Sequence, residues 1–293
     1  STFSRAAATL GWRLEGAQCL GLHATPLGAV RPWLRRGQRL ICLVRDGEAL
    51  KALAALVSGH GFGAASGWAL ERLGGPRERV RPFRLATPDL PDLQAPLALA
   101  LDLHSGPPGL PATSGLPDEL FVHDGQITKS PVRALTLRAL APRPGECLWD
   151  LGAGSGSIAV EWCLAGGRAH AVEQRAGRAD HIRQNAERFG VSHRLSVRTG
   201  ASRDCLAALP APDAVFVGGG FDGGLFDAIT AMVGPGVRLV VNSVTLDTEA
   251  LLLQLHARHG GELLQVALAQ AQPLGRMRGW QPARPVVQWS VVL

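Results

Sequence analysis

A short glycine-rich segment carries the residue types and spacing most able to do chemistry. Gly152-Ala153-Gly154-Ser155-Gly156-Ser157 follows the apolar stretch ECLWDLG and leads directly into a helical pattern. Glycines at such a turn let the backbone approach a ligand and adopt positive φ angles. A dinucleotide fingerprint would need glycine at Ser157, and a phosphate loop would need a terminal Gly-Lys-Ser/Thr. The loop therefore predicts either a binding site for a ligand without phosphate or a tight turn without a functional role.

An acidic residue ends the next expected strand, AHAVE. Glu173 follows the loop by the length of one helix and one strand, so we expect it beside the glycines at the same sheet edge. A carboxylate there can accept hydrogen bonds from both hydroxyls of a ribose, each worth about 1.5–3 kcal/mol. The glycine loop and Glu173 together predict an adenosine site without phosphates.

The composition indicates a globular chain long enough for two domains. Its 293 residues are 46% hydrophobic and 18% charged, which is enough apolar material to offset ordering entropy. No apolar run approaches the roughly 18 residues that span a bilayer, and the first residues do not resemble a targeting signal. The five cysteines lie far apart without CxxC or CxxH spacing, which predicts reduced thiols in a cytoplasmic protein and no metal site.

Periodicity predicts an α/β chain with one proline-rich connection. Short apolar runs alternate with helical segments up to about residue 104, and the stretch HSGPPGLPATSGLPDEL interrupts the pattern. We therefore expect domains at 1–104 and 117–293, joined by a linker at 105–116.

Beyond the linker, alternating strands and helices predict a doubly wound parallel sheet. Two consecutive strands, GELLQVALAQ and PVVQWSVVL, close the chain and predict an antiparallel last strand. Dinucleotide-binding folds end on parallel strands, whereas class I S-adenosylmethionine methyltransferases add a reversed hairpin here. The second domain is therefore predicted to have the class I methyltransferase fold.

Two further strand ends refine this interpretation. Ala201 and Ser202 stand where methyltransferases often place an acid for the adenine amino group, so adenine would be held by the backbone and by the Ser202 hydroxyl. Ser202 could equally cap the next helix. Gly218-Gly219-Gly220 replaces the Asn/Asp-Pro-Pro-aromatic block of many nucleic-acid methyltransferases, which indicates either an open floor for a broad substrate or a mobile loop.

Several separated motifs resemble one family. LPDELFVHDGQITKSPVRALTLRALAPRPGECLWDLGAGSGSIAVEW, VVNSVTLDTEALL and AQPLGRMRGWQPARPV resemble, in this order, the C-terminal domain of the precorrin-6Y C(5,15)-methyltransferase (decarboxylating) family of cobalamin biosynthesis. Residues 1–104 resemble the second half of a tetrapyrrole methylase domain, through STFSRAAATLGW, CLGLHATPL and ERLGGPRERV. Nothing matches its first half, so we expect Ser1 to be an internal position of a longer protein.

The resemblance implies that residues 117–293 methylate carbon 15 of a precorrin and remove carbon dioxide from the acetate at carbon 12. An intact N-terminal domain would methylate carbon 5. The family also implies a homo-oligomer, in some relatives a tetramer, without nucleic-acid or membrane partners. The implied S-adenosyl-L-methionine contacts are Thr128, Gly152, Ala153, Gly154, Ser155, Gly156, Glu173, Ala201 and Ser202.

Residue type and position suggest groups for binding and reacting the substrate. Arginine and lysine suit the recognition of carboxylates, and polar residues near the glycine loop could face the reacting atoms. Each also has a structural interpretation, as a surface cation, a turn or a packing pair. The candidates are Asn242, Glu161, Lys129, Arg133 and Arg276.

The main alternative is an RNA methyltransferase of class I fold. A net charge of +6, a pI of about 9.7 and the clusters RPWLRRGQR and RERVRPFR favour it. The absence of tyrosine and of the Pro-Pro-aromatic block argues against it. A second alternative, from another functional class, is that residues 1–104 form a non-catalytic assembly surface.

Overall fold

The computed structural model describes all 293 residues, which form two compact units. The first unit comprises residues 1–112 and 188–193, and the second comprises residues 113–187 and 194–293. The two units divide inside the proline-rich segment 105–116. None of the helices combines the length and apolarity that a membrane crossing requires.

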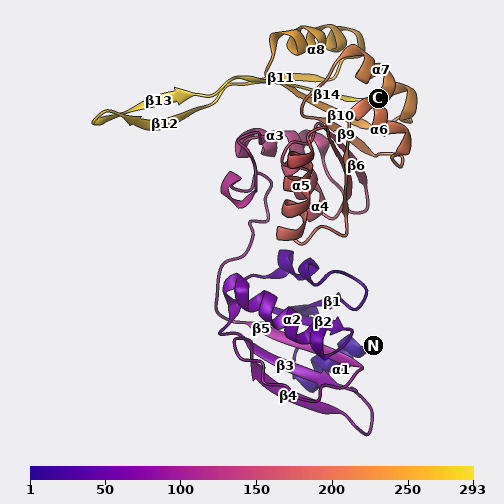
Figure 1. The fold of residues 1–293 in the computed structure, drawn as a ribbon, viewed down its shortest axis with the longest axis vertical. Helices are drawn as coiled ribbons and strands as arrows, with labels where there is room; N and C mark the ends of the chain where they lie inside the picture. Colours follow the sequence, from indigo (N-terminus) through magenta and orange to yellow (C-terminus); the bar gives the residue numbers. More distant parts are fainter. The chain divides into compact units, whose positions relative to one another are not determined.

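The first unit is a mixed five-stranded sheet with a helix against each face (Figure 1). Only β1 and β2 are parallel. Alternate residues of β2 point to opposite faces, so Leu40 packs against Leu53 of α2 while Ile41 packs against Ala7 of α1. The elements, with sheet order β1-β2-β5-β3-β4, are α1 (Thr2–Thr9), β1 (Ala17–Gly21), β2 (Gln38–Val44), α2 (Gly47–Val57), β3 (Ser66–Glu71), β4 (Arg79–Arg84) and β5 (Leu97–Leu103).

The second unit contains a seven-stranded sheet in the order β11-β14-β10-β9-β6-β7-β8. Five neighbouring strands are parallel, and β14 runs antiparallel to both β10 and β11. The predicted doubly wound sheet with an antiparallel last strand is confirmed. The strands are β6 (Cys147–Leu151), β7 (Arg168–Glu173), β8 (Leu195–Thr199), β9 (Ala214–Val217), β10 (Arg238–Ser243), β11 (Glu262–Val266) and β14 (Val286–Val292).

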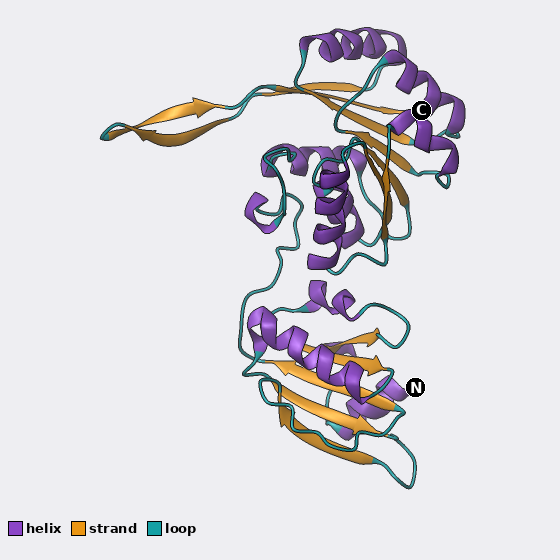
Figure 2. Cartoon of the chain, viewed as in Figure 1, coloured by secondary structure: helices purple, strands orange, loops and turns teal.

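Helices cover both faces of this sheet (Figure 2). Val215 and Val217 of β9 point to one face, where they pack in a cluster with Leu225 and Ile229 of α7 and Leu252 of α8. The intervening strand residues point to the opposite face. The helices are α3 (Ser130–Leu140), α4 (Ser157–Leu164), α5 (Ala176–Arg188), α6 (Ser202–Cys205), α7 (Gly223–Met232) and α8 (Leu246–His259).

A separate hairpin of two strands, β12 (Ala269–Leu274) and β13 (Met277–Pro282), projects from the second unit (Figure 1). The sequence predicted one continuous strand over GELLQVALAQ, and this was wrong because β11 ends at Val266 and a different strand, β12, begins at Ala269. Every residue of β12 is exposed, so the hairpin has no alternation of buried and exposed positions by which it could be recognised.

The glycine loop after β6 requires glycine for two different reasons. Gly152, Gly154 and Gly156 have φ angles of +66°, +59° and +72°. A Cβ on Gly156 would lie 2.6 Å from Cγ2 of Ile182, whereas a Cβ on Gly154 would meet its nearest atom at 3.5 Å. Gly154 is therefore required by backbone conformation alone, and Gly156 also by packing against α5.

We expect Gly156→Ala to destabilise the protein more than Gly154→Ala. Both variants place alanine in the left-handed region, at a cost of about 1–2 kcal/mol each. Gly156→Ala adds an overpacking cost of about 1–3 kcal/mol. Urea unfolding of the two variants measures the difference, and equal losses would contradict the packing role of Gly156.

Candidate active site

A cleft of about 860 Å³ opens in the second unit, where the parallel strands end. This edge of a doubly wound sheet is where ligands bind. Loops that follow the five neighbouring parallel strands contribute to its walls. Those of the predicted residues that line it are Thr128, Lys129, Gly152, Ala153, Gly154, Glu173, Ala201, Ser202 and Asn242.

Glu173 ends β7 and joins the strand end to the glycine loop. Its side chain is 6% exposed. One carboxylate oxygen accepts a hydrogen bond from the backbone N–H of Gly154 at 2.9 Å, and the other accepts from Arg175 N–H at 2.9 Å. Each oxygen retains a lone pair. The arrangement leaves acceptors for hydroxyl groups and places a negative charge beside the loop.

The three glycines after β9 have different surroundings. A Cβ on Gly218 would lie 3.2 Å from the carbonyl oxygen of Gly152, so this glycine allows the two loops to approach each other. A Cβ on Gly219 or Gly220 would meet no atom within 4 Å. The expectation of an open floor therefore fits Gly219 and Gly220, which line the cleft.

Arg133 and Glu161 do not line the cleft, contrary to the expectation that they contact substrate. Both are buried, at 0% and 6% exposure, and Arg133 Nε donates to Glu161 Oε1 at 2.6 Å. Glu161 also accepts from the backbone N–H groups of Gly115 and Leu116 at 2.7 and 3.0 Å. Arg133 further donates to the carbonyl oxygen of Thr128. The pair therefore holds the segment that carries Thr128 and Lys129 into the cleft.

The remaining candidates lie in different places. Asn242 faces the cleft from β10, and Lys129 lies at its rim, 3.5 Å from Asp118. Arg276 is exposed in the turn between β12 and β13 and is not brought to the cleft. Ser155 is buried behind the loop, with no hydrogen-bond partner for its hydroxyl.

Sequence reasoning missed several charged residues of the cleft. Arg175 and Arg203 come soon after the ends of β7 and β8, so their positions could have suggested a place at this edge. Arg284 offered no such signal, because it follows the hairpin that periodicity did not reveal. The missed charged residues are Arg175, Arg178, Arg203, Asp204, Asp222 and Arg284.

Asp150, at the end of β6, is fully buried. Its Oδ2 accepts from the backbone N–H of Ala159 at 3.1 Å, while Oδ1 has no partner. Burial raises the pKa of the Asp150 carboxyl to about 7, against the lowering effect of the Ala159 hydrogen bond. The charge of Glu173 also raises this pKa. Asp150 therefore titrates near neutral pH in the folded protein.

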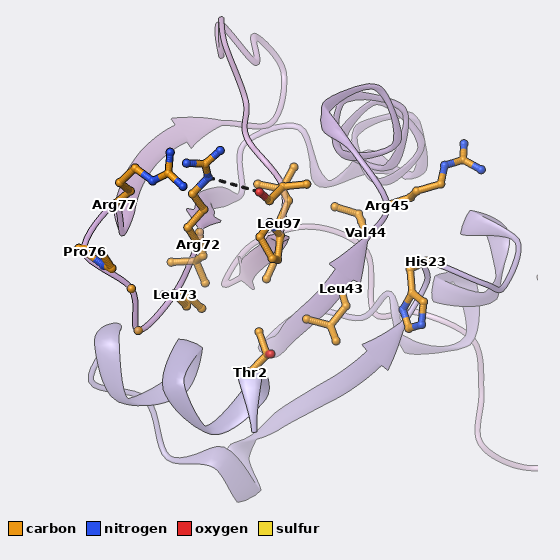
Figure 3. A pocket seen from close by; sticks show the side chains of 16 residues that line it. Thr2, His23, Leu43, Val44, Arg45, Arg72, Leu73, Pro76, Arg77 and Leu97 are labelled. Atoms are coloured by element: carbon orange, nitrogen blue, oxygen red, sulfur yellow. Dashed lines mark hydrogen bonds between the residues drawn. The ribbon is translucent and has the colours of Figure 1, made fainter.

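The first unit has a cavity of its own, of about 810 Å³ (Figure 3). Arg45, Arg72, Arg77 and His23 are among the side chains that line it. Arg72 Nε donates to the carbonyl oxygen of Ala95 at 3.4 Å. The cationic lining suits an anionic guest.

We expect Arg133→Met to lower the free energy of unfolding by about 3–5 kcal/mol, because it leaves the buried Glu161 carboxylate without its cation. Lys129→Met is the matched control. The Lys129 side chain is 57% exposed and pairs with Asp118, which also pairs with Arg133. Its loss should therefore cost about 0–1 kcal/mol. Urea unfolding measures both, and similar small losses would contradict the buried role of Arg133.

Asp150 should make stability depend on pH. Its pKa rises from 3.8 to about 7 on folding, so the folded state binds more protons between these values. Stability should therefore fall as pH rises from 3.8 to about 7, by at most about 1.4 kcal/mol per pH unit, and should level off above 7. In Asp150→Asn this contribution should vanish. Unfolding of the ligand-free protein between pH 5 and 8 tests this, and an identical slope in the variant would refute the assignment.

Comparison with known proteins places the chain in a family. A family model described as a precorrin methyltransferase domain matches residues 119–293. A Sinorhizobium sp protein named precorrin-6Y C(5,15)-methyltransferase (decarboxylating) is 47% identical, over 99% of this chain and 71% of that protein. A Pyrobaculum aerophilum protein named probable cobalt-precorrin-6B C(15)-methyltransferase (decarboxylating) is 33% identical, over 60% of this chain and 94% of that protein.

A solved structure agrees with the predicted fold class. The crystal structure of the C-terminal domain of precorrin-6Y C5,15-methyltransferase from Rhodobacter capsulatus is 56% identical, with a TM-score of 0.61. The match covers 62% of this chain and 98% of that one. The class I methyltransferase fold is thereby confirmed. The chain belongs to the precorrin methyltransferase family.

Proposed function

We propose that this chain is an S-adenosyl-L-methionine-dependent C-methyltransferase that methylates a precorrin at carbon 15 and removes carbon dioxide from the acetate at carbon 12, in cobalamin biosynthesis. The observation that carries the proposal is the hydrogen bond from the Gly154 N–H to Glu173. It occupies a loop donor that a phosphate would need and leaves carboxylate lone pairs for the hydroxyls of a nucleoside. The family membership supplies the substrate class.

The cleft residues fit the nucleoside of this cofactor. The Glu173 carboxylate has free lone pairs for ribose hydroxyls, and Ala201 and Ser202 line the neighbouring wall, where adenine would lie. A Cβ on Gly154 would meet its nearest protein atom only at 3.5 Å, so a ligand can approach the loop closely here. When bound, the cofactor supplies an electrophilic methyl group. The protein's part is alignment and exclusion of water, where proximity can contribute up to about 7–11 kcal/mol.

The cationic side chains of the cleft suit a macrocycle that carries carboxylates at its periphery. Arg178 and Arg203 are paired with Asp124 and Asp222, each at 2.8 Å. Lys129 is held only loosely by Asp118, so it can exchange that partner for a substrate carboxylate. We propose Lys129 as a carboxylate contact and Asn242 as the polar group nearest the reacting atoms. Arg133 and Glu161 position the loop instead of touching substrate.

We propose that the two activities belong to different units. The name of the Pyrobaculum relative, which matches 60% of this chain, supports carbon 15 methylation and decarboxylation by the second unit. We propose that the first unit is part of a tetrapyrrole methylase domain for carbon 5, and its arginine-lined cavity is consistent with a substrate rich in carboxylates. The comparisons do not favour the RNA methyltransferase alternative.

We further propose that the chain assembles as a homo-oligomer, such as a tetramer. The side chains of Leu274, Met277 and Trp280 on the hairpin are 69%, 76% and 76% exposed. Apolar groups this exposed favour burial against another surface.

Light scattering of the wild type and of Trp280→Ser would test this, and a monomeric wild type would contradict it.

Glu173→Ala should weaken binding of S-adenosylmethionine by about 2–3 kcal/mol, through lost charge-assisted hydrogen bonds. Isothermal titration calorimetry measures the change. Glu187→Ala removes an exposed acid outside the cleft and is the control. Unchanged affinity in Glu173→Ala would remove the ribose assignment.

The complete chain, given S-adenosylmethionine and precorrin-6B, should form a product with one added methyl group and one carbon dioxide fewer. Mass spectrometry of the tetrapyrrole gives both changes at once. Methylation without loss of carbon dioxide would contradict the decarboxylase assignment. Methyl transfer to RNA in place of the tetrapyrrole would favour the rejected alternative.

A further inference from the structure

Three polar side chains meet on the α3 face of the seven-stranded sheet. Thr136 comes from α3, Asn242 from β10 and Gln288 from β14. Thr136 is fully buried and Gln288 is 4% exposed, while Asn242 lines the cleft. The three side chains therefore form a polar cluster, the Thr136 triad, in which Asn242 is accessible to a ligand in the cleft.

The hydroxyl of Thr136 sets the orientation of both amides. It donates its single hydrogen to the carbonyl oxygen of Val132 at 2.9 Å. Its lone pairs accept from Asn242 Nδ2 at 2.8 Å and from Gln288 Nε2 at 2.9 Å. Because the hydroxyl has no second hydrogen, both amides must turn their nitrogen atoms toward it.

The second hydrogen of Gln288 Nε2 goes to Asn242 Oδ1, at 2.9 Å. A flipped Asn242 would place its nitrogen against Gln288 Nε2 and its oxygen against the Thr136 lone pairs, losing two hydrogen bonds. The amide is therefore locked. One N–H and one oxygen lone pair of Asn242 remain for a ligand.

Apolar side chains and a cation share the side of the cleft to which β10 belongs. Val244, Val266, Leu268 and Val286 line the cleft beside β10, β11 and β14, and Arg284 lies just before β14. A carboxylate that accepts a hydrogen bond from the neutral Asn242 N–H loses water without gaining a countercharge from that group. Such a site raises the energy of the bound carboxylate relative to one paired with arginine.

We propose that Thr136 and Gln288 are positioning residues, which fix the Asn242 amide so that its free N–H binds the substrate carboxylate that is lost. This inference rests on the proposed function. In the decarboxylation, the bond between the acetate methylene and the carboxyl carbon breaks, and its electron pair enters the conjugated macrocycle. Carbon dioxide leaves, and a proton from water completes the new methyl group.

The test compares Thr136→Val, which removes the hydroxyl at nearly constant volume, with Thr136→Ser, which keeps it. Thr230→Val is the control, because the Thr230 hydroxyl bonds only backbone carbonyls of α7, at 3.0 Å. In the complete chain, Thr136→Val should lower kcat for decarboxylation about tenfold or more. The affinity for S-adenosylmethionine should stay unchanged, and Thr136→Ser and Thr230→Val should behave as wild type.

A Thr136→Val variant with wild-type decarboxylation would overturn the inference. So would equal losses of cofactor binding, methylation and decarboxylation in both Thr136 variants, because that pattern indicates a merely structural role. NMR of the Asn242 side-chain NH₂ supplies a readout without turnover. We expect a slowly exchanging pair of signals in wild type and Thr136→Ser, and its loss in Thr136→Val. A wild-type protein that shows these signals but leaves the precorrin unchanged overturns the proposed function while the locked amide stands.

Discussion

The site depends on a carboxylate that accepts a hydrogen bond from the glycine loop beside it. Glu173 accepts the Gly154 N–H, so this backbone donor is no longer free for an anion. The charge of Glu173 at the same place disfavours any phosphate that approaches the loop. The same two oxygens still accept hydroxyl hydrogens. One buried acid thus fixes the loop, disfavours phosphate at this point and offers acceptors for ribose hydroxyls.

A second buried charge group supports the cleft from the other side. Arg133 contacts Glu161 and Asp118, at 2.6 and 3.1 Å, so a single cation serves two carboxylates. Those carboxylates also accept backbone N–H groups between Gly115 and Ser130. The segment that brings Thr128 and Lys129 to the cleft has little regular secondary structure. Buried hydrogen bonds to charged side chains hold it in place of the backbone hydrogen bonds of a helix or a sheet.

Features that depend on local pattern were predictable from the sequence. The alternation of strands and helices from β6 to α8 followed from periodicity, and the place of Glu173 followed from the length of one βα unit. Features that depend on distant pairs were not. Nothing local indicates that Arg133 would be buried against Glu161, or that Gln288 would meet Thr136, because these partners are 28 and 152 positions apart. The exposed hairpin was missed since it buries neither face and so leaves no periodic signal.

We interpret the cleft beside Glu173 as the binding site of a nucleoside without phosphate. A crystal structure of the complete chain with bound S-adenosylmethionine tests it most directly. We expect electron density for the cofactor in this cleft, with both ribose hydroxyls within hydrogen-bond distance of the Glu173 carboxylate. A cofactor bound elsewhere, or a ribose held by other groups while Glu173 keeps only its backbone partners, would contradict it.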